Sequence, residues 1–177
     1  MGLARELREE IGIEISTPRP LMRLRHRYPD VEVLLDIWVV RHYRGEPSGF
    51  DGQALRWCTR AELESADLLP ADQPIVAALK LPERLTEVST PHFMVVDSLD
   101  ASIEGRRRGI LCGVFCRGIG EAVAAAGAGA DFLVLRGALL PGEIAAISES
   151  VAIPVYARGI ELHEAWALGA SGVSEVI

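Results

Sequence analysis

The sequence has little of several features that would point to a function class at once. Aromatic residues make up only 6% of its 177 residues, and lysine and arginine number 18 against 25 aspartates and glutamates. The formal net charge of −7 disfavours binding to polymeric nucleic acid. No apolar run approaches the length of a membrane span, and no basic, apolar leader is present. We therefore expect a cytoplasmic protein without a membrane partner.

Cysteine is also scarce. The three cysteines, Cys58, Cys112 and Cys116, are odd in number and lack the spacing of a zinc site. Cys112 and Cys116 would share one face of a strand, where buried free thiols are expected, and a reducing compartment suits them. Apolar residues, at 49% of the chain, suffice for a core. The length allows one domain or two small ones and leaves the oligomeric state open.

The first part of the chain mixes helical, strand and turn patterns. Leu3, Leu7 and Ile11 recur every four residues and predict an amphipathic helix within residues 1–15, which Gly12 ends. The elements predicted next are strands at Leu21–Tyr28 and Val31–Tyr43, the latter apolar enough for a central strand, a short strand at Ala54–Thr59, and helices at Ala61–Leu69 and Pro74–Leu81.

After Leu81-Pro82 the chain alternates short apolar strands with alanine-rich helices, which is typical of a parallel sheet with covered faces. Gly129-Ala130 and Gly169-Ala170, 40 residues apart, each end such a helix and indicate part of a β/α barrel. The fold class is therefore α/β. The predicted strands are His92–Ser98, Gly109–Arg117, Ala130–Gly137, Ile153–Gly159 and Ser171–Ile177, and the helices are Gly120–Gly127, Gly142–Ser150 and Glu161–Gly169.

Three carboxylates lie close together in the first predicted helix. Glu6, Glu9 and Glu10 project from one face, opposite the leucine stripe, where like charges repel. Mg²⁺ would offset that repulsion, because it prefers oxygen ligands and often bridges carboxylates to substrate phosphates. A solvated helix face, on which Arg5 and Arg8 compensate the charge, is the alternative. The spacing alone leaves both open.

The order of these residues adds information. RELREEIGI, residues 5–13, resembles the second half of the Nudix box, Arg-Glu-aliphatic-x-Glu-Glu-x-Gly-aliphatic, at every specified position. The GEP, DGQ and PADQP segments follow in the order of the MutT-type branch of Nudix hydrolases. This resemblance covers residues 1–82. It implies an α/β/α sandwich that cleaves nucleoside triphosphates such as 8-oxo-dGTP to monophosphate and pyrophosphate, with Mg²⁺ or Mn²⁺ as cofactor.

The resemblance also assigns roles to single residues. It implies that Glu6, Glu9 and Glu10 bind the metal, and that Glu6, Glu9 and Asp51 act in catalysis by helping to activate the attacking water. An ordinary turn aspartate is the alternative for Asp51. The glycine and glutamate that open the full box would lie before Met1. The resemblance therefore implies an N-terminally truncated hydrolase, for which we expect low stability and little diphosphatase activity.

Two residues are candidates for substrate binding. Asp72 matches a position where the MutT-type branch usually has an asparagine that reads the base, and an aspartate accepts from purine N–H groups but donates only if protonated. Tyr28, with Trp38 and Trp57, could line the base pocket. Packing in the core is the commoner use of aromatic residues at strand positions, and we favour it for all three.

Residues 90–177 resemble a shortened thiamine-phosphate-synthase or TenI-type barrel, through the segments GAGADFLVLRG and VAIPVYARGIELHEAWALGASGVSEVI. Where that family binds phosphate with a threonine-bearing loop and a Gly-Gly turn, this chain has RGALL and RGI. Arg136 and Arg158 are expected at strand carboxyl ends, where they could bind phosphate. Surface arginines are the commoner case. We expect a partial barrel of five strands without synthase activity.

Three functions therefore compete. The leading one is a Nudix pyrophosphohydrolase acting on a nucleoside triphosphate. The second is a non-catalytic nucleotide-binding, metal-binding or regulatory fragment. The third is chemistry like that of thiamine phosphate synthase in the C-terminal half, which the missing threonine loop disfavours.

Overall fold

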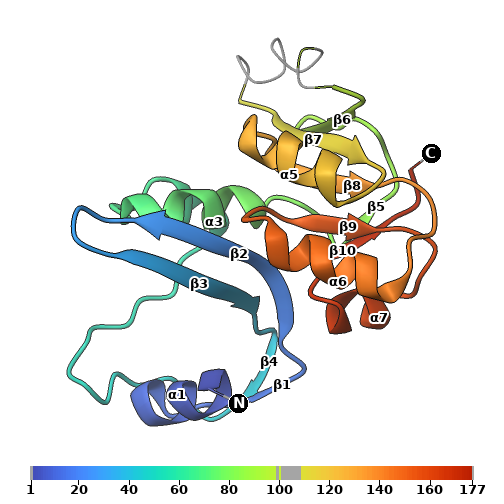
Figure 1. Cartoon of the computed structure of the whole chain (residues 1–177). Coiled ribbons are helices and arrows are strands. Elements are labelled where there is room, and N and C mark those ends of the chain that lie inside the picture. The colour runs from blue at the N-terminus through green and yellow to red at the C-terminus, as the bar shows by residue number, and fades with distance from the viewer. Residues whose placement is uncertain (1, 99, 101–108, 177) are drawn as a thin grey trace. The chain divides into compact units, whose positions relative to one another are not determined.

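The structure is a computed structural model that describes residues 2–98, 100 and 109–176 (Figure 1). Its contacts divide the chain into two compact units. Unit 1 comprises residues 1–19 and 38–67, and unit 2 comprises residues 20–37 and 68–177. The domain boundary predicted between residues 82 and 90 is a different one: it separates the segment that resembles a Nudix hydrolase from the segment that resembles a barrel. This boundary stays a prediction.

Unit 1 contains α1 (Gly2–Ile11), β1 (Glu14–Ser16), β4 (His42–Arg44) and α2 (Arg60–Glu64). The predicted end of the first helix is confirmed, because Gly12 takes a φ of +73° that breaks the helix. The wider range of residues 1–15 was too long, since β1 follows at once and pairs antiparallel with β4. The prediction of a strand at Ala54–Thr59 is wrong, because these residues form neither helix nor strand. The last of them, Thr59, caps the amino end of α2 with its side chain.

A hairpin of β2 (Arg19–Arg27) and β3 (Glu32–Val39) forms a two-stranded sheet. Its turn is closed by the Tyr28 N–H, which donates to the Val31 carbonyl oxygen at 2.8 Å. The expectation that this apolar segment is a central strand is wrong. Among the strands that the structure describes, β3 pairs only with β2, and exposed and half-buried residues alternate along it. An apolar run therefore does not reveal how many strands flank it.

The rest of unit 2 is a curled parallel sheet, and the three helices between residues 119 and 167 pack on one of its faces (Figure 1). The predicted alternation of strands and helices is confirmed, and β5 was missed because two residues carry no periodic pattern. In spatial order the strands are β5 (Arg84–Leu85), β10 (Gly172–Ser174), β9 (Val155–Ala157), β8 (Phe132–Leu135), β7 (Leu111–Cys116) and β6 (Phe93–Val96). The helices are η1 (Pro70–Asp72), α3 (Gln73–Ala78), α5 (Ile119–Gly127), α6 (Pro141–Ser150) and α7 (Leu162–Ala167).

The two edges of this sheet come close to each other. The Val95 N–H of β6 donates to the Val88 carbonyl oxygen at 2.7 Å, and the Thr90 N–H donates to the Phe93 carbonyl oxygen at 2.8 Å. Val88 follows Leu85 of β5 by only three residues, which can span at most about 11 Å. The segment after β5 thus covers the outer edge of β6, so that edge is not left open for pairing with another chain.

Side chains alternate between two cores on the faces of this sheet. Along β8, Phe132 and Val134 join the inner cluster with Phe93 and Tyr156, whereas Leu133 and Leu135 face the helices. The Phe132 ring meets the Phe93 and Tyr156 rings edge to face, at centroid distances of 5.9 and 5.8 Å. Gly113 on β7 makes this possible, because a Cβ there would lie 2.2 Å from the Phe132 ring. The interior of the curled sheet is therefore filled by aromatic side chains.

The repeat seen in the sequence corresponds to two matching helix ends. Gly129 follows α5 and Gly169 follows α7, with φ values of +94° and +78°. The next residues, Ala130 and Ala170, donate their N–H groups to carbonyl oxygens five residues earlier, each at 3.0 Å. These bonds define two Schellman motifs, which turn each chain segment toward the following strand. Ala130 and Ala170 are both buried, as a tight helix-to-strand turn requires.

Candidate functional site

The three glutamates lie on the exposed face of α1. Arg5 forms ion pairs with Glu6 at 3.8 Å and with Glu9 at 3.9 Å. The side chains of Glu6 and Glu9 are 57% and 64% exposed, so these ion pairs contribute little stability. The predicted alternative, in which arginine partly compensates the carboxylates, is thus present in the structure.

The position of these carboxylates along α1 is unfavourable for the helix itself. Glu9 and Glu10 lie in its last turn, and its first turn has no acidic residue. Because the carboxyl end of a helix carries a partial negative charge, carboxylates there raise the local negative potential. Such a concentration of charge attracts a cation, whereas a helix selected for stability alone would have its acidic residues at the other end.

The loop that carries Asp51 docks on this same end of α1. The Ser48 N–H donates to the Ile11 carbonyl oxygen and the Phe50 N–H donates to the Glu10 carbonyl oxygen, each at 3.0 Å. These bonds satisfy carbonyl groups that the end of a helix leaves without partners. The structure therefore brings the backbone around Asp51 to the helix that carries Glu6, Glu9 and Glu10. Asp51 itself is exposed.

Two glycines are needed for this docking. A Cβ at Gly12 would lie 2.7 Å from Cζ of Phe50, and a Cβ at Gly45 would lie 2.7 Å from the Gly12 carbonyl oxygen. Both glycines also have positive φ values, which other residues rarely adopt. Gly12, the glycine of the Arg-Glu-x-x-Glu-Glu-x-Gly pattern, is therefore required for two physical reasons: it ends the helix, and it leaves room for the loop.

The donor set of this face fits a divalent cation in its chemistry. Carboxylate oxygens are the ligands that Mg²⁺ and Mn²⁺ prefer. Within the part of the chain that the structure describes, no three His, Cys, Asp or Glu side chains gather closely enough to hold a metal ion. The carboxylates are thus on one face and of the right type, while Arg5 is the partner of two of them.

The opposite, apolar side of α1 lines a groove of 490 Å³ within unit 1. Its walls include Leu3, Leu7, Trp38, Tyr43 and Trp57. Trp57 is 78% exposed and stacks on Tyr43, with ring centroids 6.5 Å apart. The expectation that Trp38 and Trp57 pack in the core is therefore wrong. Trp57 is not in a strand, and Trp38 of β3 is 42% exposed.

The predicted substrate-binding residues Tyr28 and Asp72 both belong to unit 2. The Tyr28 ring meets the His26 ring edge to face at a centroid distance of 4.5 Å, and Tyr28 is half-buried. Asp72 ends the short helix η1, and its N–H donates to the Leu69 carbonyl oxygen at 2.9 Å. The roles expected for both residues in base recognition stay predictions.

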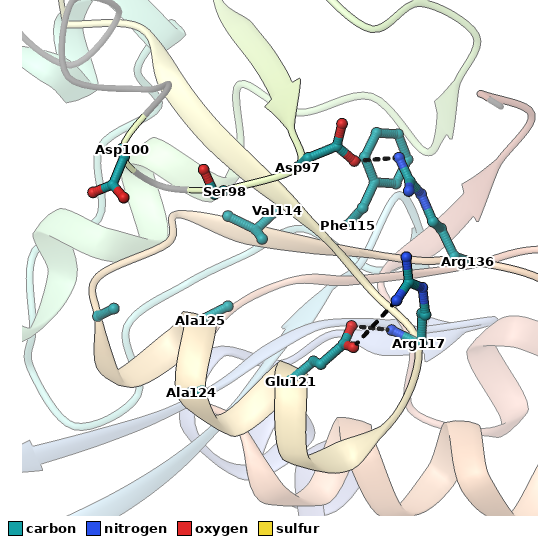
Figure 2. A pocket seen from close by; sticks show the side chains of 11 residues that line it. Asp97, Ser98, Asp100, Val114, Phe115, Arg117, Glu121, Ala124, Ala125 and Arg136 are labelled. Carbon is teal, nitrogen blue, oxygen red and sulfur yellow. Dashed lines mark hydrogen bonds and ion pairs between the residues drawn. The ribbon is translucent and has the colours of Figure 1, made fainter.

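Arg136 lies in a cleft of 680 Å³ at the carboxyl ends of β6 and β7 (Figure 2). Its guanidinium group donates to the Asp97 carboxylate and lies 4.3 Å from the centroid of the Phe115 ring. Arg117 and Glu121 form a second ion pair on the wall of the same cleft, at 3.9 Å. The strand-end position expected for Arg136 is confirmed, and Asp97 already occupies part of its hydrogen-bonding capacity.

Arg158 directly follows β9, the neighbour of β8 in the sheet, and is half-buried. Both arginines thus lie where the parallel strands end, at the carboxyl ends of the adjacent strands β8 and β9, as expected. Phosphate binding by this pair stays a prediction. The predicted burial of Cys112 and Cys116 is confirmed, and neither forms a disulfide. Burial, and then the charge of Glu121, raises the pKa of the Cys116 thiol to about 11.

Gln53 is one residue that sequence analysis did not single out. Its side-chain amide lies between the Asp51 loop and α1 and bonds to both. The available signal was its place two residues after Asp51 in a turn rich in glycine and aspartate.

The described residues contain no helix that is both long and apolar enough to cross a membrane.

Curated relatives match less than half of the chain. It is 36% identical over 79 residues to the 8-oxo-dGTP diphosphatase of Escherichia coli, a match that covers 45% of this chain and 61% of that protein. It is 34% identical over 77 residues to the CTP pyrophosphohydrolase of Escherichia coli and 31% identical over 78 residues to the 8-oxo-dGTP diphosphatase of Haemophilus influenzae. Each of these two matches covers 44% of this chain and 57% of the relative.

The chain thus spans about three fifths of the length of these curated relatives. No family model matches it. Among solved structures, FabK from Thermotoga maritima aligns with a TM-score of 0.43 at 19% identity, covering 62% of this chain and 47% of that one. Nitroalkane oxidase from Streptomyces ansochromogenes aligns with a TM-score of 0.40 at 24% identity, covering 58% and 35%.

Proposed function

We propose that this chain carries the metal-binding residues of a hydrolase that cleaves the diphosphate bond of a nucleoside triphosphate. The observation that carries the proposal is that Glu6, Glu9 and Glu10 share the exposed face of α1, with the Asp51 loop docked on the carboxyl end of this helix. The names of the relatives, 8-oxo-dGTP diphosphatase and CTP pyrophosphohydrolase, support the same reaction class. Monophosphate and pyrophosphate are the expected products.

In this proposal Mg²⁺, or Mn²⁺ in its place, is held by Glu6, Glu9 and Glu10. When bound, the cation neutralises phosphate oxygens and lowers the pKa of a bound water. Glu6, Glu9 and Asp51 supply carboxylates that orient this water and accept its proton. Arg5 must release Glu6 and Glu9 in part, because both ion pairs use carboxylate oxygens that the metal needs.

Substitution of Glu9 tests this function. Pyrophosphate release from 8-oxo-dGTP, dGTP and CTP is measured with the full chain in the presence and absence of Mg²⁺. We expect only slow Mg²⁺-dependent turnover, in line with the low activity predicted from the sequence. Glu9→Gln should lower it by about 100-fold or more, because the substitution removes one metal ligand and one proton acceptor. Glu14→Gln is the matched control: Glu14 is an exposed glutamate of β1, and this variant should leave turnover unchanged.

The same assay separates a second candidate, a module that binds metal or nucleotide without turnover. Such a module would show Mg²⁺ binding sensitive to Glu9→Gln and no pyrophosphate release by the unsubstituted chain. Turnover that is equal in the unsubstituted chain and in Glu9→Gln would reject the assignment of the site. A preference for 8-oxo-dGTP over CTP that Asp72→Asn changes would support base recognition by Asp72.

For unit 2 we propose a partial barrel that is related to thiamine-phosphate-synthase or TenI-type proteins but has no synthase activity. Phe93, Phe132 and Tyr156 pack against one another in the interior of its curled sheet. Arg136 and Arg158 are then the residues best placed to bind a phosphate, at the carboxyl ends of β8 and β9. Inorganic phosphate binding that Arg158→Gln abolishes would support this role.

A further inference from the structure

Gln53 joins two parts of the proposed metal site through one side chain. Its Nε2 donates to the Glu10 carbonyl oxygen at 3.2 Å, and its Oε1 accepts the Asp51 backbone N–H at 2.9 Å. The first bond spans 43 positions of sequence, whereas the second is local to the turn. Only a side chain with both a donor and an acceptor can make this pair of bonds, and a carboxamide has both.

The surrounding backbone is shaped to keep these bonds. The Glu10 carbonyl oxygen also accepts the Phe50 N–H, so it binds the loop at two points. A Cβ at Gly49 would lie 2.0 Å from the Gln53 carbonyl oxygen, so only glycine permits this tight turn. The turn and α1 therefore meet in a fixed register, in which Gln53 is the contact that also reaches Asp51.

We propose that Gln53 is a positioning residue, which holds the Asp51 backbone against the carboxyl end of α1 so that Asp51 and the α1 glutamates act on the same divalent cation. The inference rests on the proposed function, because it presumes a cation at Glu6, Glu9 and Glu10. Gln53 acts through Asp51 and contacts neither metal nor substrate. Without its bridge, Asp51 keeps its carboxylate but loses its fixed distance from the helix.

The test uses the full chain and Mn²⁺ alone as the probe, with affinity measured from the relaxation of water protons. Gln53→Met keeps the length of the side chain and removes both hydrogen bonds. We expect this variant to bind Mn²⁺ about five- to tenfold more weakly. A change of this size corresponds to the net free energy of about one hydrogen bond. Gln73→Met, which changes an exposed glutamine of α3, is the matched control and should leave the affinity unchanged.

A second readout follows the loop in the metal-free protein. Amide hydrogen exchange of Asp51 should become about tenfold faster in Gln53→Met, because its N–H loses its acceptor, while Gln73→Met should have no effect. A double-mutant cycle then separates positioning from general loop order. In an Asp51→Asn background, Gln53→Met should cause no further loss of Mn²⁺ affinity, because the bridge acts only through Asp51.

The outcomes distinguish the inference from the function on which it rests. If Glu9→Gln weakens Mn²⁺ binding but Gln53→Met does not, the positioning role of Gln53 is wrong and the metal site stands. Additive losses from Gln53→Met and Asp51→Asn would also overturn it, since Gln53 would then act independently of Asp51. If the chain does not bind Mn²⁺, or binds it equally after Glu9→Gln, both the proposed function and the inference are overturned.

Discussion

The two units of this chain differ most in how much they bury. Among the described residues of unit 1, Ile13 is the one buried hydrophobic side chain, and no residue of α1 is buried. Unit 2 buries a filled aromatic interior and a second, helix-covered cluster. Unit 1 is therefore held mainly by backbone hydrogen bonds and turn geometry, whereas unit 2 is held by hydrophobic burial.

The residues with the strongest predicted chemical role do not lie in the unit that buries the most. The carboxylates with the most specific sequence signal, Glu6, Glu9 and Glu10, lie in the sparsely packed unit. Sparse burial gives a low local stability, which is common in segments that move when they bind a ligand. If unit 1 binds a cation as proposed, the cation should stabilise this unit, because a ligand that binds only the ordered state stabilises that state. The predictions below test this difference in burial, from the largest expected effect to the smallest.

The largest effect is expected from truncating an aromatic side chain in each unit. Phe132 is fully buried between Phe93 and Tyr156, so Phe132→Ala should lower the free energy of unfolding by about 3–5 kcal/mol. Trp57→Ala removes a larger ring that is 78% exposed, and should change it by about 0.5 kcal/mol or less. Urea denaturation followed by circular dichroism measures both. Equal losses in the two variants would contradict the difference in burial.

A smaller effect is expected from adding a single methyl group inside the curled sheet. Gly113→Ala places a Cβ 2.2 Å from the Phe132 ring, so overpacking should cost about 1–3 kcal/mol of unfolding free energy. Gly120→Ala in α5 meets no atom within 4 Å, and should instead stabilise by about 0.5–1 kcal/mol through its helix propensity. If side chains fill the interior of the curled sheet, thermal unfolding should show a lower melting temperature for Gly113→Ala and a higher one for Gly120→Ala.

In unit 1 the corresponding test concerns turn geometry. Gly12 and Gly52 have φ values of +73° and +79°, so an alanine at either position is strained by about 1 kcal/mol. At Gly12 the new Cβ also meets the Phe50 ring at 2.7 Å, whereas at Gly52 it meets nothing within 4 Å. Gly12→Ala should therefore cost about 1 kcal/mol more than Gly52→Ala. The difference should appear in the amide exchange of Ser48 and Phe50, and equal exchange rates in both variants would show that the loop does not depend on this contact.

The smallest effect is visible only in alkaline solution. The pKa of Cys116 is raised from 9.0 to about 11, chiefly by burial. Between these values the unfolded thiol has lost its proton while the folded one keeps it, so the free energy of unfolding falls as pH rises from about 9 to about 11. Cys116→Ala should reduce this fall. Cys58→Ala, which changes an exposed thiol of unit 1, should leave it unchanged.

Much of the fold could be predicted from local patterns. The strands and helices of unit 2 follow from their apolar runs, and the two Schellman ends follow from the Gly-Ala pairs at 129–130 and 169–170. Some elements were missed or misjudged where the pattern was too short or ambiguous. β5 has only two residues, and the apolar sequence of β3 suits a central strand although the strand pairs with β2 alone. Ladder partners depend on the tertiary arrangement, which hydrophobic periodicity does not encode.

The sequence by itself determined that carboxylates share one face of the first helix, because helical periodicity places Glu6, Glu9 and Glu10 together whatever surrounds them. It also determined that this helix ends at Gly12, since the backbone there needs a positive φ. Only the tertiary structure decided that Gln53 links Glu10 to Asp51, that Asp97 pairs with Arg136, and that Trp57 stays exposed. The physical reason is range: propensity and periodicity act over a few residues, whereas these contacts depend on where distant segments meet when the chain folds.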